Sequence, residues 1–327
     1  MAEKTGWGIV GAGNIARKMA SALKTLPEAE LVAVGSRAQD KAQAFADETG
    51  AAKAFGSYED MIQDPEVDIV YIATPHPMHA ENMLMAIDHG KAVLSEKPFT
   101  VNHYEAERVV TAAREKSVFV MEGMWTRFLP IMRRLKELVQ EGRIGQVRMV
   151  QADFGFRAGV DPKSRLFDLK LGGGALLDVG VYCVSLAYWV LGEPKETVAI
   201  AHLGETGADE QNGILLGYEG GQMALLSSAI RTNTPHNATI IGTDGHIRIP
   251  NFWHADSMVV ASDGTEETIE LPFGENGFEF EAEECIRCLR GGRLESPVMP
   301  LDETLSIMKT MDSIREPWGL VYPSDRW

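Results

Sequence analysis

The sequence predicts an α/β protein, with an N-terminal doubly wound parallel sheet followed by a C-terminal α/β part that contains an open, mostly antiparallel sheet. Three observations predict this arrangement. Up to about residue 122, short apolar runs alternate with longer amphipathic stretches, as in βαβ units. The first of these units contains a glycine-rich turn between a strand-like run and a helix-like stretch. After Gly123, strand-like runs follow one another across short turns, which indicates antiparallel pairing.

The apolar runs of the first part are expected to be buried strands of a parallel sheet. They lie at Trp7 to Val10, Leu31 to Val34, Ile69 to Ala73, Ala92 to Leu94 and Val118 to Met121. The amphipathic stretches between them predict helices over residues 14–26, 38–49, 77–89 and 103–116. Because βαβ crossovers are right-handed, these units give a doubly wound sheet.

After Gly123 the order of predicted elements changes, with several strands in succession. Helices are expected over residues 127–142, 174–191, 277–290 and 302–315. Strands are expected at residues 147–156, 197–203, 213–218, 223–230, 238–242 and 257–262. The length of 327 residues is about twice that of a typical domain, so we expect one domain over residues 1–122 and a second over residues 123–327.

Composition argues against several classes of partner and location. The chain has 47 acidic and 31 basic residues, a net charge of -16 and no basic run, so a nucleic-acid partner is not expected. The N-terminus is too short and too interrupted by glycine for a secretory signal, and no apolar run approaches the roughly 18 residues of a membrane span. Three cysteines cannot form a disulfide framework. We therefore expect a soluble cytoplasmic protein.

Two of the cysteines, Cys285 and Cys288, form a C-x-x-C pattern inside a helix-like stretch. Phe280, Cys285 and Leu289 trace an apolar stripe along that stretch, so we interpret the cysteines as core residues rather than a redox pair. A metal site would need two more ligands that the neighbouring sequence does not offer. No metal is predicted.

The candidate cofactor site is the turn Gly11-Ala12-Gly13-Asn14-Ile15-Ala16. It follows the first strand-like run and opens the first predicted helix, which is the context that the G-x-G-x-x-[GA] fingerprint requires. Such a turn brings backbone N–H groups to the positive end of the helix, where a dinucleotide pyrophosphate can bind. The expected binding residues of this turn are Gly11, Gly13, Asn14 and Ile15.

The second strand-like run ends in Gly35-Ser36-Arg37, without an acidic residue. An aspartate or glutamate there would bind the ribose 2′-hydroxyl of NAD, whereas arginine and a hydroxyl group suit a 2′-phosphate. Ser36 and Arg37 therefore predict a preference for NADP over NAD. The alternative is that Arg37 is a solvated loop residue.

Further candidates follow the next two strands. Thr74, Pro75, His76 and His79 come after the run Ile69 to Ala73, at the edge where ligands of open α/β sheets bind. We interpret them as residues around the nicotinamide ribose. Glu96 and Lys97 end the following strand and are also expected beside the cofactor.

Lys97 is the first candidate for catalysis. It precedes Pro98, so its backbone is biased towards extended geometry that continues the strand. The alternative is an ordinary surface lysine. Asp178 and Tyr182 are further candidates, because they follow three glycines and are spaced to share one face of a helix. They could equally be an ordinary polar helix face.

Four ordered motifs carry a resemblance to a known family. GIVGAGNIA, ATPHPMHAE, SEKPFT and GGGALLDVGVYCVSLAYWVLG resemble the successive signatures of the glucose-fructose oxidoreductase and inositol dehydrogenase family, over essentially the whole chain. MEGMWTRFLP is similar to the branch that contains dimeric dihydrodiol dehydrogenase and NADP-dependent D-xylose dehydrogenase.

The resemblance implies a Rossmann domain for nucleotide binding and a C-terminal domain for substrate binding and for homodimers formed through its sheet. It also implies that Lys97, Asp178 and Tyr182 serve catalysis, and that the bond before Pro98 is cis. Many relatives carry histidine in place of Tyr182 and aspartate in place of Ser185. This departure favours the dihydrodiol or pentose branch over inositol-type substrates.

The expected function is hydride transfer between the nicotinamide of NADP and a carbinol carbon of an aldose such as a pentose, or of a cyclic trans-dihydrodiol. Lys97 would stabilise the charge that develops on the substrate oxygen, and Tyr182 would exchange the proton. Two alternatives remain: an NAD(P)-dependent glycoside-cleaving enzyme on the same fold, and a non-catalytic regulator that senses the nucleotide.

Overall fold

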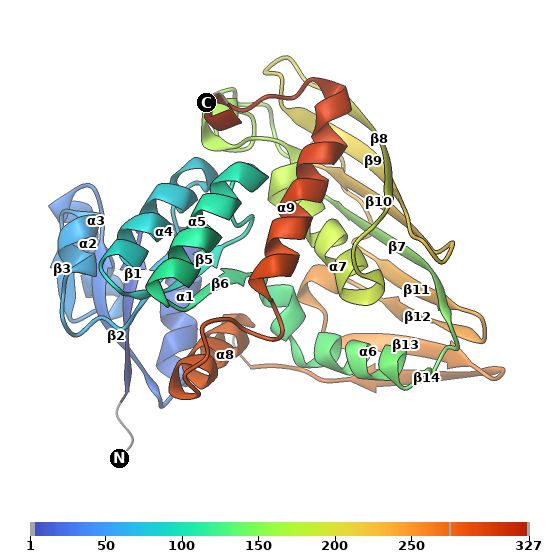
Figure 1. Cartoon of the computed structure of the whole chain (residues 1–327), viewed down its shortest axis with the longest axis horizontal. Coiled ribbons are helices and arrows are strands. Elements are labelled where there is room, and N and C mark those ends of the chain that lie inside the picture. Colours follow the sequence, from blue (N-terminus) through green and yellow to red (C-terminus); the bar gives the residue numbers. More distant parts are fainter. Residues whose placement is uncertain (1–3, 275, 326–327) are drawn as a thin grey trace. The chain divides into compact units, whose positions relative to one another are not determined.

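The structure is a computed structural model that describes residues 4–274 and 276–325. The described residues form two compact units, whose elements are labelled in Figure 1. The first unit contains the chain up to Thr100, Tyr104–Trp125 and Gly274–Thr304. The second contains Val101–His103, Thr126–Phe273 and the described residues from Leu305 onwards. The assignment of residues 1–122 to the nucleotide and of residues 123–327 to the substrate stays a prediction.

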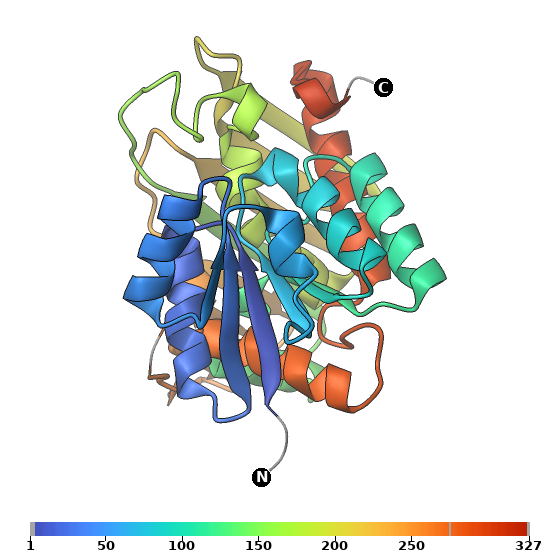
Figure 2. The ribbon, with the colours of Figure 1, turned by 90° about the vertical axis from the view of Figure 1, so that its left-hand side faces the viewer.

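The described residues of the first unit form a six-stranded parallel sheet with strand order β3-β2-β1-β4-β5-β6. Its strands are β1 (Thr5–Val10), β2 (Ala29–Gly35), β3 (Lys53–Phe55), β4 (Ile69–Ile72), β5 (Ala92–Glu96) and β6 (Val120–Gly123). Its helices are α1 (Asn14–Thr25), α2 (Gln39–Thr49), α3 (Tyr58–Ile62), α4 (His79–Asp88), α5 (His103–Lys116) and α8 (Phe278–Arg290). Figure 2 shows helices on both sides of this sheet.

Burial explains why the sequence signal for this sheet is strong. Every residue of β1, β4, β5 and β6 is buried, as expected for parallel strands covered on both faces. The predicted doubly wound sheet is confirmed. The sequence analysis missed β3, which has only half-buried residues, and α3, which is a single short turn.

The described residues of the second unit form an eight-stranded sheet with strand order β14-β13-β12-β11-β7-β10-β9-β8. The strands are β7 (Val147–Gly155), β8 (Glu196–Leu203), β9 (Asp209–Gly217), β10 (Met223–Ala229), β11 (Ala238–Gly242), β12 (Gly245–Ile249), β13 (Ser257–Ser262) and β14 (Thr265–Glu270). Neighbouring strands pair antiparallel, except β7 and β10, which run parallel. The predicted mostly antiparallel sheet is therefore confirmed.

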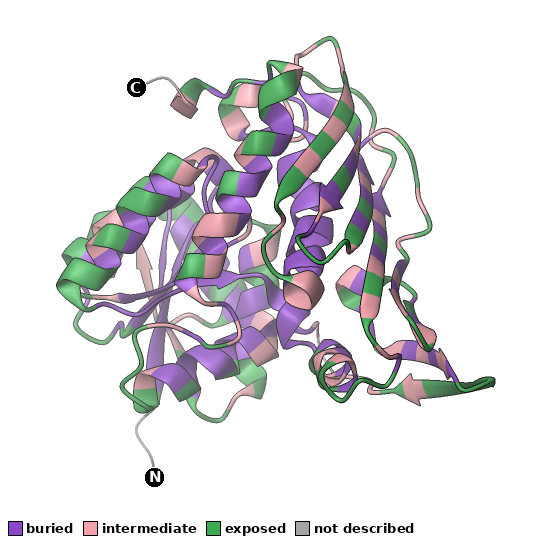
Figure 3. Ribbon diagram, turned by 45° about the vertical axis from the view of Figure 1, so that its right-hand side comes forward, coloured by how far each residue is buried: buried purple, intermediate pink, exposed green. Residues whose placement is uncertain are grey.

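Helix α7 (Val181–Leu191) packs against β7 and β10 of this sheet. Two further helices, α6 (Pro130–Gln140) and α9 (Leu301–Arg315), follow β6 and α8 along the chain. Residues of β8 to β10 alternate between more and less exposed positions, which Figure 3 shows as bands of colour. One face of β8 to β10 is thus covered, and the other face is exposed to solvent among the described residues.

Three elements of the second unit also differ from the sequence-based expectation. The helix expected over residues 174–191 is not α-helical throughout, because Leu176–Gly180 forms a π-helical turn before α7. The strand β12 was missed. So was β14, whose sequence TEETIE is polar and largely exposed, so it lacks the apolar alternation that identifies a half-buried strand.

One segment, Leu169–Leu191, is long and apolar enough to cross a membrane by length and composition alone. The expectation that no run approaches this length was therefore wrong for this segment. However, 83% of its most apolar window is buried inside the protein, as in the core helix of a globular domain. Cytoplasmic location stays a prediction.

The core interpretation of Cys285 and Cys288 is confirmed. Both side chains are buried on α8, and neither forms a disulfide within the described residues. Burial raises the pKa of Cys285 well above its usual range and that of Cys288 to about 11. Thiols that stay protonated are poor nucleophiles and poor metal ligands.

Candidate functional site

The glycine turn lies directly between β1 and α1. Gly11 has φ +106°, a conformation that favours glycine, and a Cβ there would approach the carbonyl oxygen of Ala73 to 2.9 Å. Gly13 is the residue before α1, which begins at Asn14. The structure describes no side-chain hydrogen bond that caps this helix and no acidic residue in its first turn. The backbone N–H groups of that turn are therefore open to an anionic ligand.

A cavity of about 230 Å³ lies at this turn, where β1, β2 and β4 end. It brings together six of the predicted cofactor residues and is lined by Gly11, Ala12, Gly13, Ser36, Arg37, Ala38, Lys41, Tyr58, Ala73, Thr74 and Pro75. None of these described lining residues is acidic, and two of them are basic. A pocket with this lining suits a ligand that carries phosphate groups.

Lys41 and Tyr58 line the cavity but were missed by the sequence analysis. Lys41 follows Arg37 by four residues and lies in the first turn of α2, so the spacing offered a weak signal. Tyr58 opens α3, an element that the sequence analysis did not predict. Asn14 and Ile15 begin α1 beside the glycine turn, while His76, His79 and Glu96 are not among the residues that line the cavity.

His79 is fully buried at the start of α4. Its ring nitrogens lie 2.8 Å from the carbonyl oxygen of Thr74 and 2.9 Å from that of Pro98. Burial lowers the pKa of His79, and a neutral imidazole can donate to only one of these two carbonyls. The ring thus connects the segments after β4 and β5, and its predicted contact with the cofactor stays a prediction. His76 lies 5.8 Å from it, measured between ring centroids.

Glu96 ends β5 and is 6% exposed. Its carboxyl accepts a hydrogen bond from the Tyr71 hydroxyl and another, of 3.2 Å, from the backbone N–H of Lys97. Burial raises the pKa of Glu96, although Lys97 and Tyr71 act in the opposite direction. The bond between Lys97 and Pro98 is cis, which confirms what the family resemblance implied. Glu96 and Tyr71 therefore fix the backbone from which Lys97 projects.

Glu281, on α8, was missed by the sequence analysis. It is fully buried, and neither carboxyl oxygen has a hydrogen-bond partner among the described residues. Burial raises its pKa well above the usual range, and the nearby Glu96 carboxyl acts in the same direction. The only signal was its place on the face of α8 that also carries Cys285 and Cys288.

In the second unit, Asp178 lies in the π-helical turn and Tyr182 in the first turn of α7. Asp178 is 6% exposed, and its Oδ1 accepts a hydrogen bond of 2.7 Å from Arg165, which was not singled out before. Ser185, the position where many relatives carry aspartate, accepts a 2.8 Å hydrogen bond from the buried Arg127. π-helical turns occur often at functional sites.

Aromatic rings surround Tyr182. Phe154 lies 5.3 Å from the Tyr182 ring, and Trp253 stacks on Phe154 at 5.0 Å with an interplanar angle of 17°. His236 has φ +60° and accepts a hydrogen bond of 3.3 Å from the Trp253 indole. Phe154 therefore packs beside the phenol, and Trp253 packs on Phe154.

Comparison with known proteins decides the family. Residues 5–124 match the family described as "Oxidoreductase family, NAD-binding Rossmann fold", and residues 132–248 match the GFO/IDH/MocA C-terminal domain. The trans-1,2-dihydrobenzene-1,2-diol dehydrogenase of Xenopus laevis is 38% identical over 332 residues, covering 98% of this chain and 99% of the relative. The protein belongs to the GFO/IDH/MocA oxidoreductase family. The human enzyme of the same name is 35% identical, with 98% of each chain covered.

Solved structures of related oxidoreductases resemble this GFO/IDH/MocA oxidoreductase over almost its whole length. A 3-ketoreductase from Actinomadura kijaniata in complex with NADP and TDP-benzene is 27% identical with a TM-score of 0.86, covering 96% of this chain and 98% of that chain. The aldose-aldose oxidoreductase from Caulobacter crescentus, complexed with glycerol, is 26% identical with a TM-score of 0.89, covering 96% of this chain and 97% of that chain. The resemblance inferred from the four motifs is confirmed, and the protein is an enzyme of the oxidoreductase class with the NAD-binding Rossmann fold.

No group of three or more His, Cys, Asp or Glu side chains is arranged to hold a metal ion in the described part of this GFO/IDH/MocA oxidoreductase. The predicted catalytic set of Lys97, Asp178 and Tyr182 is divided between the two units, with Lys97 in the first and the other two in the second. Their joint action stays a prediction.

Proposed function

We propose that the protein is an NADP-dependent oxidoreductase that transfers a hydride between nicotinamide and a carbinol carbon of a cyclic trans-dihydrodiol or an aldose such as a pentose. The observation that supports this most is the match along 98% of the chain to dehydrogenases named for a cyclic trans-diol. One structural relative is named an aldose-aldose oxidoreductase, which supports including sugars among the proposed substrates.

The cofactor is proposed to bind at the cavity beside the glycine turn. The uncapped first turn of α1 would hold the pyrophosphate through its N–H groups. Arg37 and Lys41, with the hydroxyl of Ser36, would hold the 2′-phosphate that distinguishes NADP from NAD. The bound nicotinamide would supply or accept the hydride.

Lys97 is proposed to stabilise the charge that develops on the substrate oxygen during hydride transfer. The Glu96 carboxyl accepts a hydrogen bond from the backbone N–H of Lys97 and fixes the backbone of Lys97 directly after β5. A positioned ammonium group stabilises a developing alkoxide most effectively where water is excluded.

Tyr182 is proposed to exchange the proton with the substrate oxygen. Tyr182 is 8% exposed and its ring packs against Phe154, which limits competing water. Asp178 is proposed to hold a substrate hydroxyl or to orient Lys97. The 2.7 Å ion pair between Asp178 and the exposed Arg165 fixes the direction of the carboxylate.

This function predicts turnover with NADP on at least one member of a panel of aldoses, polyols and cyclic diols, followed by the absorbance of reduced nicotinamide. Arg37→Ala should raise the KM for NADP by about tenfold or more and leave rates with NAD within about twofold, because one charge-assisted phosphate contact is lost. Arg108→Ala, which removes another exposed arginine, serves as the control and should change neither.

A strong preference of the unmodified protein for NAD would contradict the role of Arg37. Tightly held nucleotide with cleavage of a glycoside and no net change in nicotinamide absorbance would favour the glycoside-cleaving alternative. Turnover of no panel member would favour a regulator that senses the nucleotide.

We also propose that a second copy of the chain covers the open face of β8 to β10, giving the homodimer that the family resemblance implies. Val198 and Ile200 are 63% and 77% exposed, and Leu215, Met223 and Leu225 are also exposed on these strands. Gly213 lies among them in a depression where a Cβ would meet no atom within 4 Å. Contiguous exposed apolar surface of this kind marks protein interfaces.

The homodimer predicts a specific loss of assembly. Ile200→Glu should convert a dimer into a monomer at micromolar concentration, because it places a charge in an apolar interface. Leu294→Glu, at another exposed leucine in the first unit, is the control and should leave the dimer intact. Light scattering coupled to size exclusion measures both, and a monomeric unmodified protein would refute the proposal.

A further inference from the structure

The loop Gly172–Gly174 precedes the turn that carries Asp178 and is held by side chains from distant parts of the second unit. Gly174 has φ +131°, and a Cβ at this position would lie 2.1 Å from Oδ1 of Asp209 and 3.3 Å from the hydroxyl of Tyr322. Glycine is therefore required here both by its backbone conformation and by the close approach of these two side chains.

Asp209 holds the loop from the side of the sheet. It lies at the start of β9 and is fully buried. Its Oδ2 accepts hydrogen bonds of 2.8 Å from the backbone N–H of Leu176 and 2.8 Å from the amide of Asn212. Leu176 is the first residue of the π-helical turn, so the carboxyl satisfies a donor that the helix cannot satisfy itself.

The same network continues beneath the far end of that turn. Ser228, on β10, donates a 2.9 Å hydrogen bond to Oδ1 of Asn212. Its hydroxyl oxygen lies 2.9 Å from the place that a Cβ of Gly180 would occupy. Gly180 is the last residue of the π-helical turn. Buried polar side chains from two strands thus support both ends of the turn that contains Asp178.

Tyr322 holds the loop from the side of the C-terminal tail. Its hydroxyl donates a 3.0 Å hydrogen bond to the carbonyl of Gly173, and its side chain is 1% exposed. Its backbone N–H donates to Asp325 at 2.7 Å. The guanidinium of Arg315 lies 5.0 Å from the centre of the Tyr322 ring.

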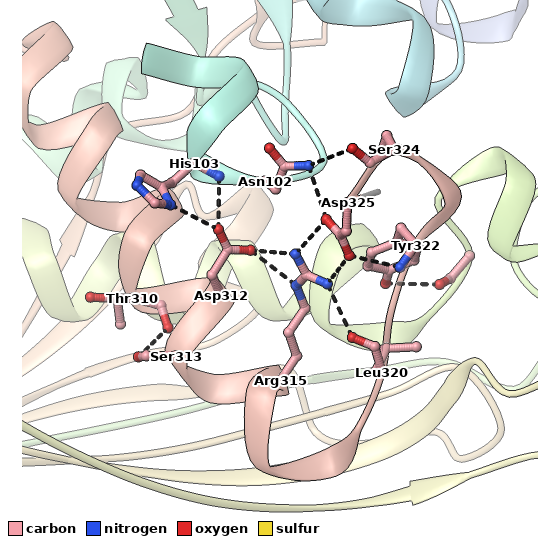
Figure 4. A network of polar contacts seen from close by, with 11 residues as sticks. Asn102, His103, Thr310, Asp312, Ser313, Arg315, Leu320, Tyr322, Ser324 and Asp325 are labelled. Carbon is pink, nitrogen blue, oxygen red and sulfur yellow. Dashed lines mark hydrogen bonds and ion pairs between the residues drawn. The ribbon is translucent and has the colours of Figure 1, made fainter. Parts of the chain in front are cut away.

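Arg315 fixes this tail to α9, as Figure 4 shows. Its side chain is 8% exposed and forms ion pairs with both Asp325 and Asp312, each with an N···O distance of 2.5 Å. Burial acts in the opposite direction, yet the ion pairs lower the pKa of the Asp325 carboxyl and raise the pKa of Arg315, because each charge stabilises the other. A buried, bidentate ion pair specifies geometry more than it adds stability, so we interpret the tail as a fixed support.

We propose that Asp209 and Tyr322 are positioning residues, which hold the loop Gly172–Gly174 from two sides and thereby orient Asp178 and Tyr182. The effect on catalysis rests on the proposed function, because it assumes the role given to Tyr182. The statement that Asp209 and Tyr322 hold the loop does not depend on that function. Displacement of a reacting group by about 1 Å can cost roughly 100-fold in rate, so a support of this kind bears directly on turnover.

Tyr322→Phe and Asp209→Ala test this proposal. Tyr322→Phe removes the donor to the Gly173 carbonyl and keeps the ring, and Asp209→Ala removes the oxygen that accepts from Leu176 and Asn212. Each should lower kcat by about tenfold or more, with the KM for NADP and for substrate within about threefold. Each should also speed hydrogen–deuterium exchange in peptides that cover residues 172–182.

Tyr188→Phe is the matched control. Tyr188 is another buried tyrosine of the second unit, on α7, and its hydroxyl lies 2.7 Å from that of Thr310 rather than near the glycine loop. The control should lose similar thermal stability while kcat and exchange in residues 172–182 stay unchanged.

Unchanged exchange in residues 172–182 of both variants would overturn the proposal. So would faster exchange with unchanged kcat in a protein that turns over the panel. If the unmodified protein has no turnover, the proposed function fails, and the exchange measurement alone decides whether Asp209 and Tyr322 hold the loop.

Discussion

Lys97→Met should lower kcat by roughly 100- to 10,000-fold while the protein still binds NADP with an affinity within about threefold of the original. Methionine keeps most of the length and apolar stem of the side chain but removes the ammonium group. Lys97 is half-buried directly after β5, and its ammonium is the group proposed to stabilise the substrate oxygen. The loss should therefore appear in the chemical step rather than in cofactor binding.

The measurement is steady-state turnover with the best substrate of the panel, combined with titration of NADP by protein fluorescence. Lys116→Met is the control, because Lys116 is an exposed lysine at the end of α5 that pairs with Asp88. It should change turnover by less than about twofold, as surface ion pairs contribute little. Near-normal turnover of Lys97→Met would remove Lys97 from the mechanism.

Tyr182→Phe should lower kcat/KM by a similar factor, roughly 100- to 10,000-fold, if the phenol exchanges the proton. Phenylalanine keeps the ring that packs 5.3 Å from Phe154, so the aromatic cluster should persist and thermal stability should change little. The loss can then be assigned to the hydroxyl. The pH profile of kcat/KM should also lose the limb that the phenol contributes.

A change of less than about threefold in Tyr182→Phe would reduce Tyr182 to a packing residue. Tyr188→Phe, on the same helix, controls for the loss of a buried hydroxyl. The double variant of Lys97 and Tyr182 should cost far less than the product of the two single losses, since groups that act on one step as a unit are not additive.

The cofactor cavity shows what local sequence can predict. The glycine turn, Ser36-Arg37 and Thr74-Pro75 each follow a strand, and parallel strands of one sheet bring their carboxyl ends to the same edge. Six predicted residues therefore line one cavity. Tyr58 could not be predicted in the same way, because α3 is five residues long and too short for a periodic pattern.

The surroundings of several other candidate residues could not be predicted from local sequence. The spacing of Asp178 and Tyr182 fits an ordinary α-helix, and the π-helical turn became visible only in the structure. Arg165 reaches Asp178 from an irregular loop, without any periodic signal. Glu281 occupies a position that any exposed helix could give to glutamate, and only the packing of α8 buries it without a partner among the described residues.

Local sequence was enough to predict the fold class, the glycine turn and the order of the family's motifs, because strand and helix periodicity and turn chemistry act between residues close in the chain. The tertiary structure decided which polar groups are buried and what they hold. Asp209 bonds Leu176 of the π-helical turn across 33 residues of sequence, and Tyr322 bonds Gly173 across 149, and such contacts leave no local pattern. Their geometry depends on how strands and helices pack, which is set by burial over the whole unit rather than by any single segment.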